Sequence, residues 1–149
     1  MHPLRNPAPR LHALVPCAGT GSRAGTAQPK QYQVLHGRPM VMHTLAALGQ
    51  VARLDSVLLA VSPDDRYLDA LQPPATVVAC GGATRAATVV QGLQALQAAG
   101  AHADDWVLVH DAARCLVTAL DVNRLIDACI GDAVGGLLAT PLADTLKQV

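Results

Sequence analysis

The chain has 149 residues, enough for one domain with a buried core. Hydrophobic residues make up 51% of it and charged residues 15%, which excludes a disordered chain, and the balance of eleven basic and eleven acidic residues argues against binding to nucleic acid or anionic membranes. Aromatic residues make up only 2%, which argues against a stacking platform for single-stranded nucleic acid, and no apolar stretch reaches the roughly 18 residues of a membrane span.

Short apolar runs alternate with helix-forming segments along the chain. We expect residues 1–10 to be a loose tail and residues 11–149 to form one domain. In chain order, the predicted elements are a strand at Leu11–Pro16, a helix at Pro39–Gly49, a strand at Ser56–Val61, a short helix at Asp64–Leu71, a strand at Thr76–Ala79, a helix at Thr84–Ala99, a strand at Trp106–Val109, a helix at Ala119–Ile130 and a strand at Gly136–Thr140.

Strands that are apolar on both faces and alternate with helices predict an α/β fold of the three-layer, Rossmann-like kind, with a mostly parallel sheet. Sheets of this kind bind ligands outside the carboxyl ends of their strands. Four features follow predicted strands: the glycine-rich loop after Pro16, Ser62-Pro63-Asp64, Gly81-Gly82, and Asp111. We therefore expect these four features to converge in space.

The glycine-rich loop matches three kinds of phosphate-binding segment to different degrees. Gly19–Ala24 fits a variant of the dinucleotide fingerprint, but Gly25 and Pro29 interrupt the helix that this motif requires, and no carboxylate follows before Asp55. The chain contains no Gly-Lys pair, which excludes a P-loop. The remaining interpretation is an open loop that wraps a nucleoside triphosphate, since glycines let backbone N–H groups approach phosphate oxygens.

Arg23 and Lys30 lie in this loop with no carboxylate nearby, so they are either solvated surface charges or cations that neutralise a triphosphate; the position after a buried strand favours the second. Asp111 directly follows a buried strand. A single carboxylate together with phosphate oxygens commonly holds Mg²⁺, although the same aspartate could cap the next segment. Arg85 is expected to serve a helix start or a neighbouring loop, and His110 to be structural.

The four cysteines show no C-x-x-C spacing and no histidine at a zinc-ligand distance, so reduced thiols in a cytoplasmic protein are expected. They are Cys17, Cys80, Cys115 and Cys129.

Five motifs together resemble the 2-C-methyl-D-erythritol 4-phosphate cytidylyltransferase family, over the stretch from about Ala13 to the last residue. The pairing of P-K-Q-Y with V-H-D-A-A-R is more specific than any glycine pattern. In chain order the motifs are Gly19-x-Gly21-x-Arg23, Pro29-Lys30-Gln31-Tyr32, Gly81-Gly82-x-x-Arg85, Val109-His110-Asp111-Ala112-Ala113-Arg114 and Asp144-Thr145-x-Lys147.

The resemblance implies a nucleotidyltransferase fold and a reaction in which CTP and methylerythritol phosphate give a CDP-alcohol and pyrophosphate with Mg²⁺, in a homodimer. By matching position, Arg23 and Lys30 take the catalytic, charge-stabilising roles and Asp111 the role of magnesium ligand. Arg114 and Thr145 match acceptor-binding positions, with Thr145 acting in a neighbouring subunit. The positions that match CTP contacts are Ala18, Gly19, Thr20, Gly21, Gly82, Ala83, Thr88, Asp111 and Ala112.

This sequence departs from the family pattern at three positions and in length. Thr88 stands where serine is usual, Cys115 where proline usually follows the D-A-A-R arginine, and Ala83 where some members have a polar residue. Family chains continue well past Val149, so we expect the C-terminal part of the fold to be absent. Two alternatives stay open: a cytidylyltransferase for another polyol phosphate, and a shortened nucleotide-binding module with little activity.

Overall fold

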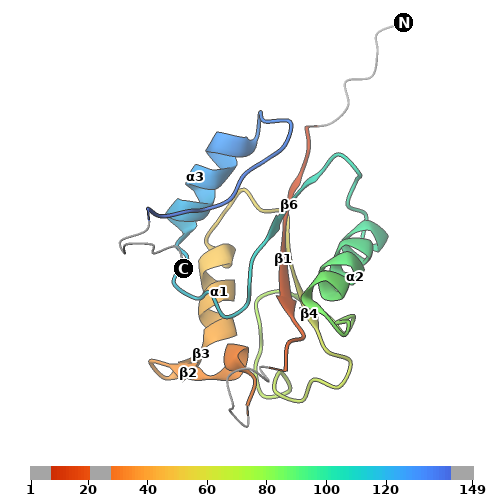
Figure 1. Ribbon diagram of the computed structural model, residues 1–149, viewed down its shortest axis with the longest axis vertical. Coiled ribbons are helices and arrows are strands. Elements are labelled where there is room, and N and C mark those ends of the chain that lie inside the picture. The colour runs from red at the N-terminus through yellow and green to blue at the C-terminus, as the bar shows by residue number, and fades with distance from the viewer. Residues whose placement is uncertain (1–7, 21–27, 142–149) are drawn as a thin grey trace, which may run out of the picture.

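The computed structural model of the protein describes residues 8–20 and 28–141, which form a four-stranded parallel sheet, a small hairpin and three α-helices (Figure 1). The sheet has the strand order β5-β4-β1-β6. In chain order the elements are β1 (Leu11–Cys17), a 3-10 helix η2 (Lys30–Tyr32), β2 (Val34–Leu35), β3 (Arg38–Pro39), α1 (Met40–Gly49), β4 (Ser56–Val61), β5 (Thr76–Val78), α2 (Arg85–Ala98), β6 (Trp106–Val109) and α3 (Ala119–Cys129).

Strand β1 is the centre of the sheet, because it pairs in parallel with β4 on one edge and with β6 on the other. Its side chains alternate between the two faces, as strand geometry requires. Ala13 and Val15 belong to the core cluster on one face, whereas Leu14 belongs to the cluster on the other. All three are fully buried, which explains why the strand is apolar on both faces.

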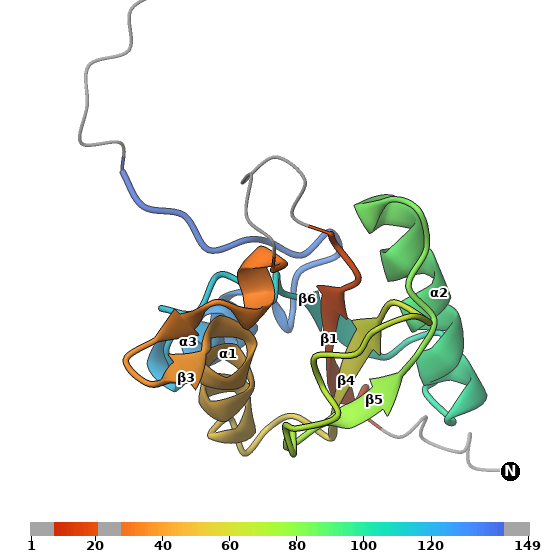
Figure 2. The ribbon, with the colours of Figure 1, turned by 90° about the horizontal axis from the view of Figure 1, so that it is seen from below.

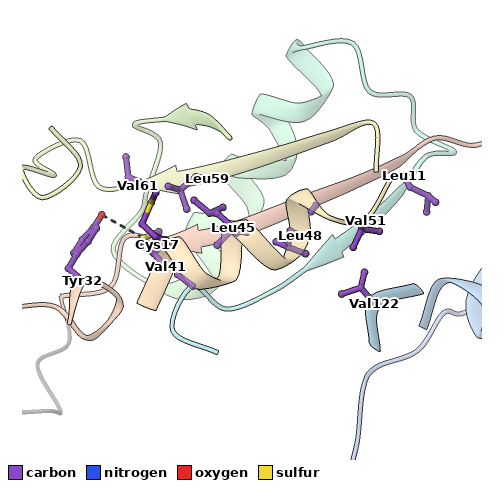
Figure 3. Packing of buried hydrophobic residues seen from close by; sticks show 14 of the residues in the cluster. Leu11, Cys17, Tyr32, Val41, Leu45, Leu48, Val51, Leu59, Val61 and Val122 are labelled. Atoms are coloured by element: carbon purple, nitrogen blue, oxygen red, sulfur yellow. Dashed lines mark hydrogen bonds between the residues drawn. The ribbon is translucent and has the colours of Figure 1, made fainter. Parts of the chain in front are cut away.

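Helices cover both faces of the sheet, so the fold is a three-layer α/β sandwich, as the sequence predicts. Figure 2 shows α1 and α3 on one side of the row of strands and α2 on the other. Val41, Leu45 and Leu48 of α1 pack with β1 and β4 in the larger core cluster (Figure 3). On the opposite face Leu96 of α2 packs with Leu14 in the smaller cluster.

Side-chain caps fix the starts of two helices. Thr118 precedes α3 in a capping box: its hydroxyl accepts from the N–H of Asp121, whose carboxylate accepts from the N–H of Thr118. Thr84 caps α2 by accepting from the N–H of Ala87 at 3.1 Å. Within residues 8–20 and 28–141, no helix is long and apolar enough to cross a membrane.

The predicted helix at Asp64–Leu71 is wrong. The Oδ1 atom of Asp65 accepts from the backbone N–H groups of Tyr67 and Leu68, at 2.9 and 3.2 Å. An aspartate that bonds its own downstream backbone competes with helix formation, and the segment forms turns instead.

The predicted strand at Gly136–Thr140 is also wrong, since this run forms no strand. A strand needs a neighbouring strand to pair with, and this segment instead begins where the chain passes the Trp106 side chain of β6 and the Cys129 side chain of α3. A Cβ at Gly135 would lie 3.1 Å from the Trp106 ring, and one at Gly136 would lie 2.8 Å from the Cys129 sulfur of α3. Leu137 in this unpaired run is 78% exposed.

The short β2–β3 hairpin was not predicted. Its turn residues His36 and Gly37 both have positive φ, 48° and 78°, which is the conformation of a tight hairpin turn. The remaining predicted strands and helices are confirmed to within one residue at each end.

A cluster around Asp105 ties together the amino ends of β1 and β6. The Asp105 carboxylate accepts from the backbone N–H groups of Arg10 and His102, at 2.9 and 2.7 Å. It also contacts the Arg10 guanidinium at 3.0 Å and Nε2 of the buried His12 at 3.2 Å. The His102 and Arg10 backbone donors, aided by His12 and the Arg10 charge, hold the pKa of Asp105 far below its usual value of 3.8.

We expect Asp105→Asn to lower the melting temperature by several degrees at pH 7, because an amide NH₂ would face the donors that now meet a carboxylate oxygen. Since folding depresses the pKa of Asp105, its stabilising contribution is present above pH 3.8 and is lost as the pH falls below that value. The stability difference between the two proteins should therefore shrink on acidification. Melting temperatures measured between pH 7 and pH 3 test this, with the exposed neighbour Asp104→Asn as control; an equal difference at all pH values would contradict it.

Candidate functional site

A cavity of about 950 Å³ opens at the carboxyl edge of the sheet. The four features that follow predicted strands all line it, so the predicted convergence is confirmed. The predicted site residues on its walls are Ala18, Gly19, Thr20, Lys30, Gly82, Ala83, Thr88, Asp111 and Ala112. Arg114 lines an adjoining cavity. Gly21, Arg23 and Thr145 lie outside the described residues.

The floor of the cavity requires glycine at position 81. The Gly81 N–H donates to the Val61 carbonyl at 2.7 Å, which joins the segment after β5 to the end of β4. A Cβ at Gly81 would lie 2.2 Å from the Ala18 Cβ and 2.8 Å from the Val61 oxygen. Only a residue without a side chain allows the segment that precedes α2 to approach the exit of β1 this closely.

The hydroxyl of Thr88 holds this segment in place. It accepts from the N–H of Gly82 at 3.1 Å and donates to the carbonyl of Thr84 at 3.0 Å. Thr88 is buried, and it comes from the first turn of α2. The Thr88 hydroxyl is therefore engaged within the segment that precedes α2.

Asp111 lies between two arginines at the end of β6. Arg85 Nε and Nη2 each lie 2.8 Å from its Oδ1 atom, and Arg114 Nε donates to Oδ2 at 2.9 Å. Partial burial alone would raise the pKa of Asp111, but the two guanidinium groups outweigh it and hold the pKa below its usual range. The carboxylate is therefore ionised at neutral pH and already carries two cationic partners.

The link to Asp111 gives Arg85 a place in the site that the sequence did not predict. It lies in the first turn of α2, lines the cavity and is 61% exposed. The sequence shows that Arg85 lies three residues after Gly82, but it does not predict that Arg85 pairs with Asp111, which lies 26 positions further along the chain. His110 Nε2 lies 2.9 Å from the carbonyl of Arg114, across the turn that follows β6, and His110 also lines the cavity beside Arg114.

Lys30 stands where the large cavity meets a second one. The second cavity has a volume of about 610 Å³ and adjoins the first at Lys30 and Ala113. Its walls combine the cations Lys30 and Arg114 with the apolar side chains of Leu35 and Met40. The η2 turn that carries Lys30 is closed by the N–H of Gln33, which donates to the Lys30 carbonyl at 3.1 Å.

Asp111 is suited to hold a divalent cation of the magnesium type. A carboxylate offers about four lone-pair directions, and the hydrogen bonds from Arg85 Nε and Arg114 Nε use one on each oxygen, so acceptor capacity remains for a cation. Within the described part of the chain, no three His, Cys, Asp or Glu side chains cluster as a complete metal site. Magnesium is commonly bound by one or two carboxylates together with the phosphates of a substrate, and Asp64 on the wall of the same cavity offers a second carboxylate.

Comparison with known proteins gives one family. The profile of the family described as IspD, 2-C-methyl-D-erythritol 4-phosphate cytidylyltransferase, matches residues 11–149. The chain is 55% identical to the bifunctional enzyme IspD/IspF of Albidiferax ferrireducens over 98% of its own length and 36% of that protein. It is 50% identical to the 2-C-methyl-D-erythritol 4-phosphate cytidylyltransferase of Paraburkholderia phymatum, over 94% of its length and 61% of that enzyme.

Solved structures agree with this result. A crystal structure of a 4-diphosphocytidyl-2C-methyl-D-erythritol synthase superposes with a TM-score of 0.81 at 36% identity, over 95% of this chain and 64% of that one. The Francisella tularensis enzyme gives a TM-score of 0.72 at 28% identity, over 94% and 61% of the two chains. These neighbours confirm the nucleotidyltransferase fold. The chain spans about three-fifths of the length of the monofunctional relatives.

Gly81→Ala should destabilise the protein by about 1–3 kcal/mol, because neither the Ala18 Cβ nor the Val61 carbonyl is a flexible side-chain end that can move aside. Gly49→Ala is the matched control, since a Cβ there meets nothing within 4 Å. That substitution should be neutral or stabilise by about 0.5–1 kcal/mol, because Gly49 ends a helix. Urea unfolding of both variants checks this, and equal stabilities would show that the contact between Gly81 and Ala18 imposes no constraint.

Proposed function

The chain belongs to the 2-C-methyl-D-erythritol 4-phosphate cytidylyltransferase family, and from this membership we propose that it transfers the CMP moiety of CTP to 2-C-methyl-D-erythritol 4-phosphate and releases pyrophosphate. Such an enzyme supplies the non-mevalonate route to isoprenoids. The observation that carries the proposal is the position of Lys30 between two cavities, one bordered by the glycine-containing strand exits and the other by Arg114.

In the proposed arrangement CTP occupies the larger cavity. Backbone groups of Ala18 to Thr20 approach the phosphates, and the Gly82–Thr88 segment faces the nucleoside. The acceptor phosphate occupies the smaller cavity beside Lys30 and Arg114, with its carbon skeleton against Leu35 and Met40. The two ligands then meet at Lys30, where a bond between them must form.

The reaction needs positioned positive charge more than it needs a base. A phosphate oxygen of the acceptor is already anionic at neutral pH, so it attacks the α-phosphorus without losing a proton. A new P–O bond forms to the acceptor oxygen, the bond between the α-phosphorus and the bridging oxygen breaks, and pyrophosphate leaves with the electron pair. Lys30 stabilises the charge that gathers on the α-phosphoryl oxygens, together with Arg23 from the part of the loop outside the described residues.

Asp111 would hold Mg²⁺ through its carboxylate, and the bound ion would neutralise the triphosphate. The pairing of Asp111 with Arg85 and Arg114 keeps this carboxylate ionised and aimed at the cavity. Arg114 is exposed, so its guanidinium is able to leave Asp111 and turn toward an anionic acceptor.

The proposal extends to the assembly and the compartment. We infer a homodimer, as the family resemblance implies, in which Thr145 of one subunit contacts the acceptor bound to its neighbour. Exposed apolar side chains at Leu116, Leu120 and Leu137 support an association of this kind. Four free cysteines support a cytoplasmic location, where thiols are kept reduced.

A turnover assay with CTP, Mg²⁺ and methylerythritol phosphate tests the activity, with pyrophosphate release as the readout. It should be run on this chain and on a version extended to the length of its relatives. Release with methylerythritol phosphate but not with pentitol phosphates supports the proposal. Release only with another polyol phosphate would reassign the acceptor, and CTP binding without release by either version would leave a nucleotide-binding module.

Lys30→Ala should lower kcat by about 10²–10³-fold in whichever of the two chain lengths is active, because the lost ammonium acts on charge that develops in the transition state. Lys30→Arg should retain part of the activity, since it keeps the charge but not the shape. Arg66→Ala, which removes an exposed cation that borders neither cavity, is the control. A kcat for Lys30→Ala within about twofold of the parent would remove Lys30 from the reaction.

Asp111→Asn should raise the Mg²⁺ concentration needed for half-maximal activity by about tenfold, because a neutral amide is a weaker ligand for a hard cation. Binding of Mn²⁺ in the presence of CTP, followed by electron paramagnetic resonance, gives a readout that does not depend on turnover. Asp64→Asn, on the wall of the same cavity, tells whether a second carboxylate takes part. Unchanged metal titrations for Asp111→Asn would show that Asp111 is not a ligand.

A further inference from the structure

The two residues that follow Lys30 are buried, although both have polar side chains. Gln31 is 8% exposed and Tyr32 is 2% exposed, whereas Lys30 itself is exposed at the cavity. A buried polar side chain is expensive unless its hydrogen bonds are satisfied. The partners of Gln31 and Tyr32 therefore show what these two residues do.

Gln31 joins the two arms of the glycine-rich loop. Its side-chain Nε2 donates to the carbonyl of Gly19 at 2.8 Å and to the carbonyl of Cys17 at 3.2 Å. Both carbonyls lie where the chain leaves β1, so one amide group fixes the η2 turn against the exit of the central strand.

Tyr32 fixes the other side of the same turn. Its hydroxyl donates to Oδ2 of Asp65 at 2.5 Å and accepts from the Cys17 thiol at 3.6 Å (Figure 3). Its ring stacks on Tyr67 with centroids 4.8 Å apart. Asp65 is itself held by backbone N–H groups of its own turn, so the phenol is tied to a rigid acceptor.

The protonation states suit this arrangement. Burial raises the pKa of Cys17 to about 12, so the thiol keeps its proton and donates to the phenol oxygen. Burial, with the neighbouring Cys17 and Asp65, also raises the pKa of Tyr32, so the phenol keeps the proton that it donates to Asp65. At neutral pH the Cys17 thiol therefore donates to the Tyr32 hydroxyl, and the Tyr32 hydroxyl donates to Asp65.

We propose that Gln31 and Tyr32 are positioning residues that fix Lys30 at the junction of the two cavities. The inference rests on the proposed role of Lys30 in CTP binding and turnover. A lysine ammonium sits on a flexible four-carbon stem, so the fold controls its place only by fixing the backbone from which the stem starts. Two buried anchors directly after Lys30 restrict that backbone, and a misplacement of about 1 Å is enough to cost roughly 10²-fold in rate.

A double-mutant cycle on CTP binding separates positioning from general stability. Lys30→Ala should weaken the Kd for Mg²⁺-CTP by about tenfold, as expected when a charged contact is lost. Gln31→Ala should weaken it by a similar factor. The combined effect in the double variant should be less than multiplicative, because the part of the Gln31 effect that acts through Lys30 is lost with the lysine, whereas the part that acts through Gly19 remains. Tyr32→Phe keeps the stacked ring and loses only the hydroxyl. The controls are Gln94→Ala, on the exposed face of α2, and Tyr67→Phe, which leaves the bond between Tyr32 and Asp65 intact.

A second readout works without any nucleotide. The chain contains only two lysines, Lys30 and Lys147. Selective labelling with ¹⁵N-lysine therefore gives two backbone amide signals, which Lys147→Arg assigns. The Lys30 amide should show the order parameter of rigid backbone, about 0.85, and should fall below about 0.6 in Gln31→Ala. Tyr32→Phe should lower it in the same direction.

The outcomes separate the two proposals. If Lys30→Ala leaves CTP binding unchanged, the role of Lys30 fails, and the order of its amide still decides whether Gln31 and Tyr32 hold it. A second outcome is that Lys30→Ala weakens CTP binding, that the fold-changes in Kd of Lys30→Ala and Gln31→Ala multiply in the double variant, and that the Lys30 amide stays ordered in Gln31→Ala. That outcome overturns the positioning role and leaves the proposed function standing. If Gln31→Ala fails to melt cooperatively, Tyr32→Phe, the smallest change in the set, takes its place in both measurements.

Discussion

The parallel pairing of β1 on both of its edges is the constraint on which the rest of the structure depends. Cys17 lies opposite Val61 of β4, and Leu14 lies opposite Val109 of β6. Three strand ends therefore face the same edge of the sheet, and the segments that follow them have to meet there. A slip of one residue would move Leu14 to the face of α1 and α3 and Val15 to the face of α2, exchanging two fully buried sets of side chains. The two-faced core therefore secures the register that brings the cavity residues together.

Charge at the cavity follows from the same geometry. Of the cations that line the larger cavity among the described residues, Arg85 is already paired with Asp111, whereas no carboxylate pairs with Lys30. An anionic ligand thus meets Lys30 without first breaking an ion pair. Arg85 and Arg114 keep unused N–H donors beside their bonds to Asp111, so an anionic ligand meets them as partly neutralised cations.

Much of this arrangement could be predicted from the sequence, and each exception has its own physical cause. Apolar runs such as Ser56–Val61 predicted strands correctly because burial on both faces leaves a continuous signal. The positions of Asp111 and Gly82 could be predicted because a parallel sheet presents all its strand ends at one edge. The helix predicted at Asp64–Leu71 failed because the Asp65 side chain bonds its own downstream backbone, and the strand predicted at Gly136–Thr140 failed because it has no strand partner.

Aspartates at the two edges of the sheet show how one side chain serves stability at one end and chemistry at the other. Asp105, at the amino edge, is 5% exposed and accepts from two backbone N–H groups whose positions the fold fixes. Asp111, at the carboxyl edge, is held by the side chains of Arg85 and Arg114, which are 61% and 77% exposed. These long side chains can turn away while the backbone stays in place, so their bonds to Asp111 are exchangeable. The backbone donors make Asp105 a permanent part of the fold, whereas the exposed side-chain donors leave Asp111 available to a ligand.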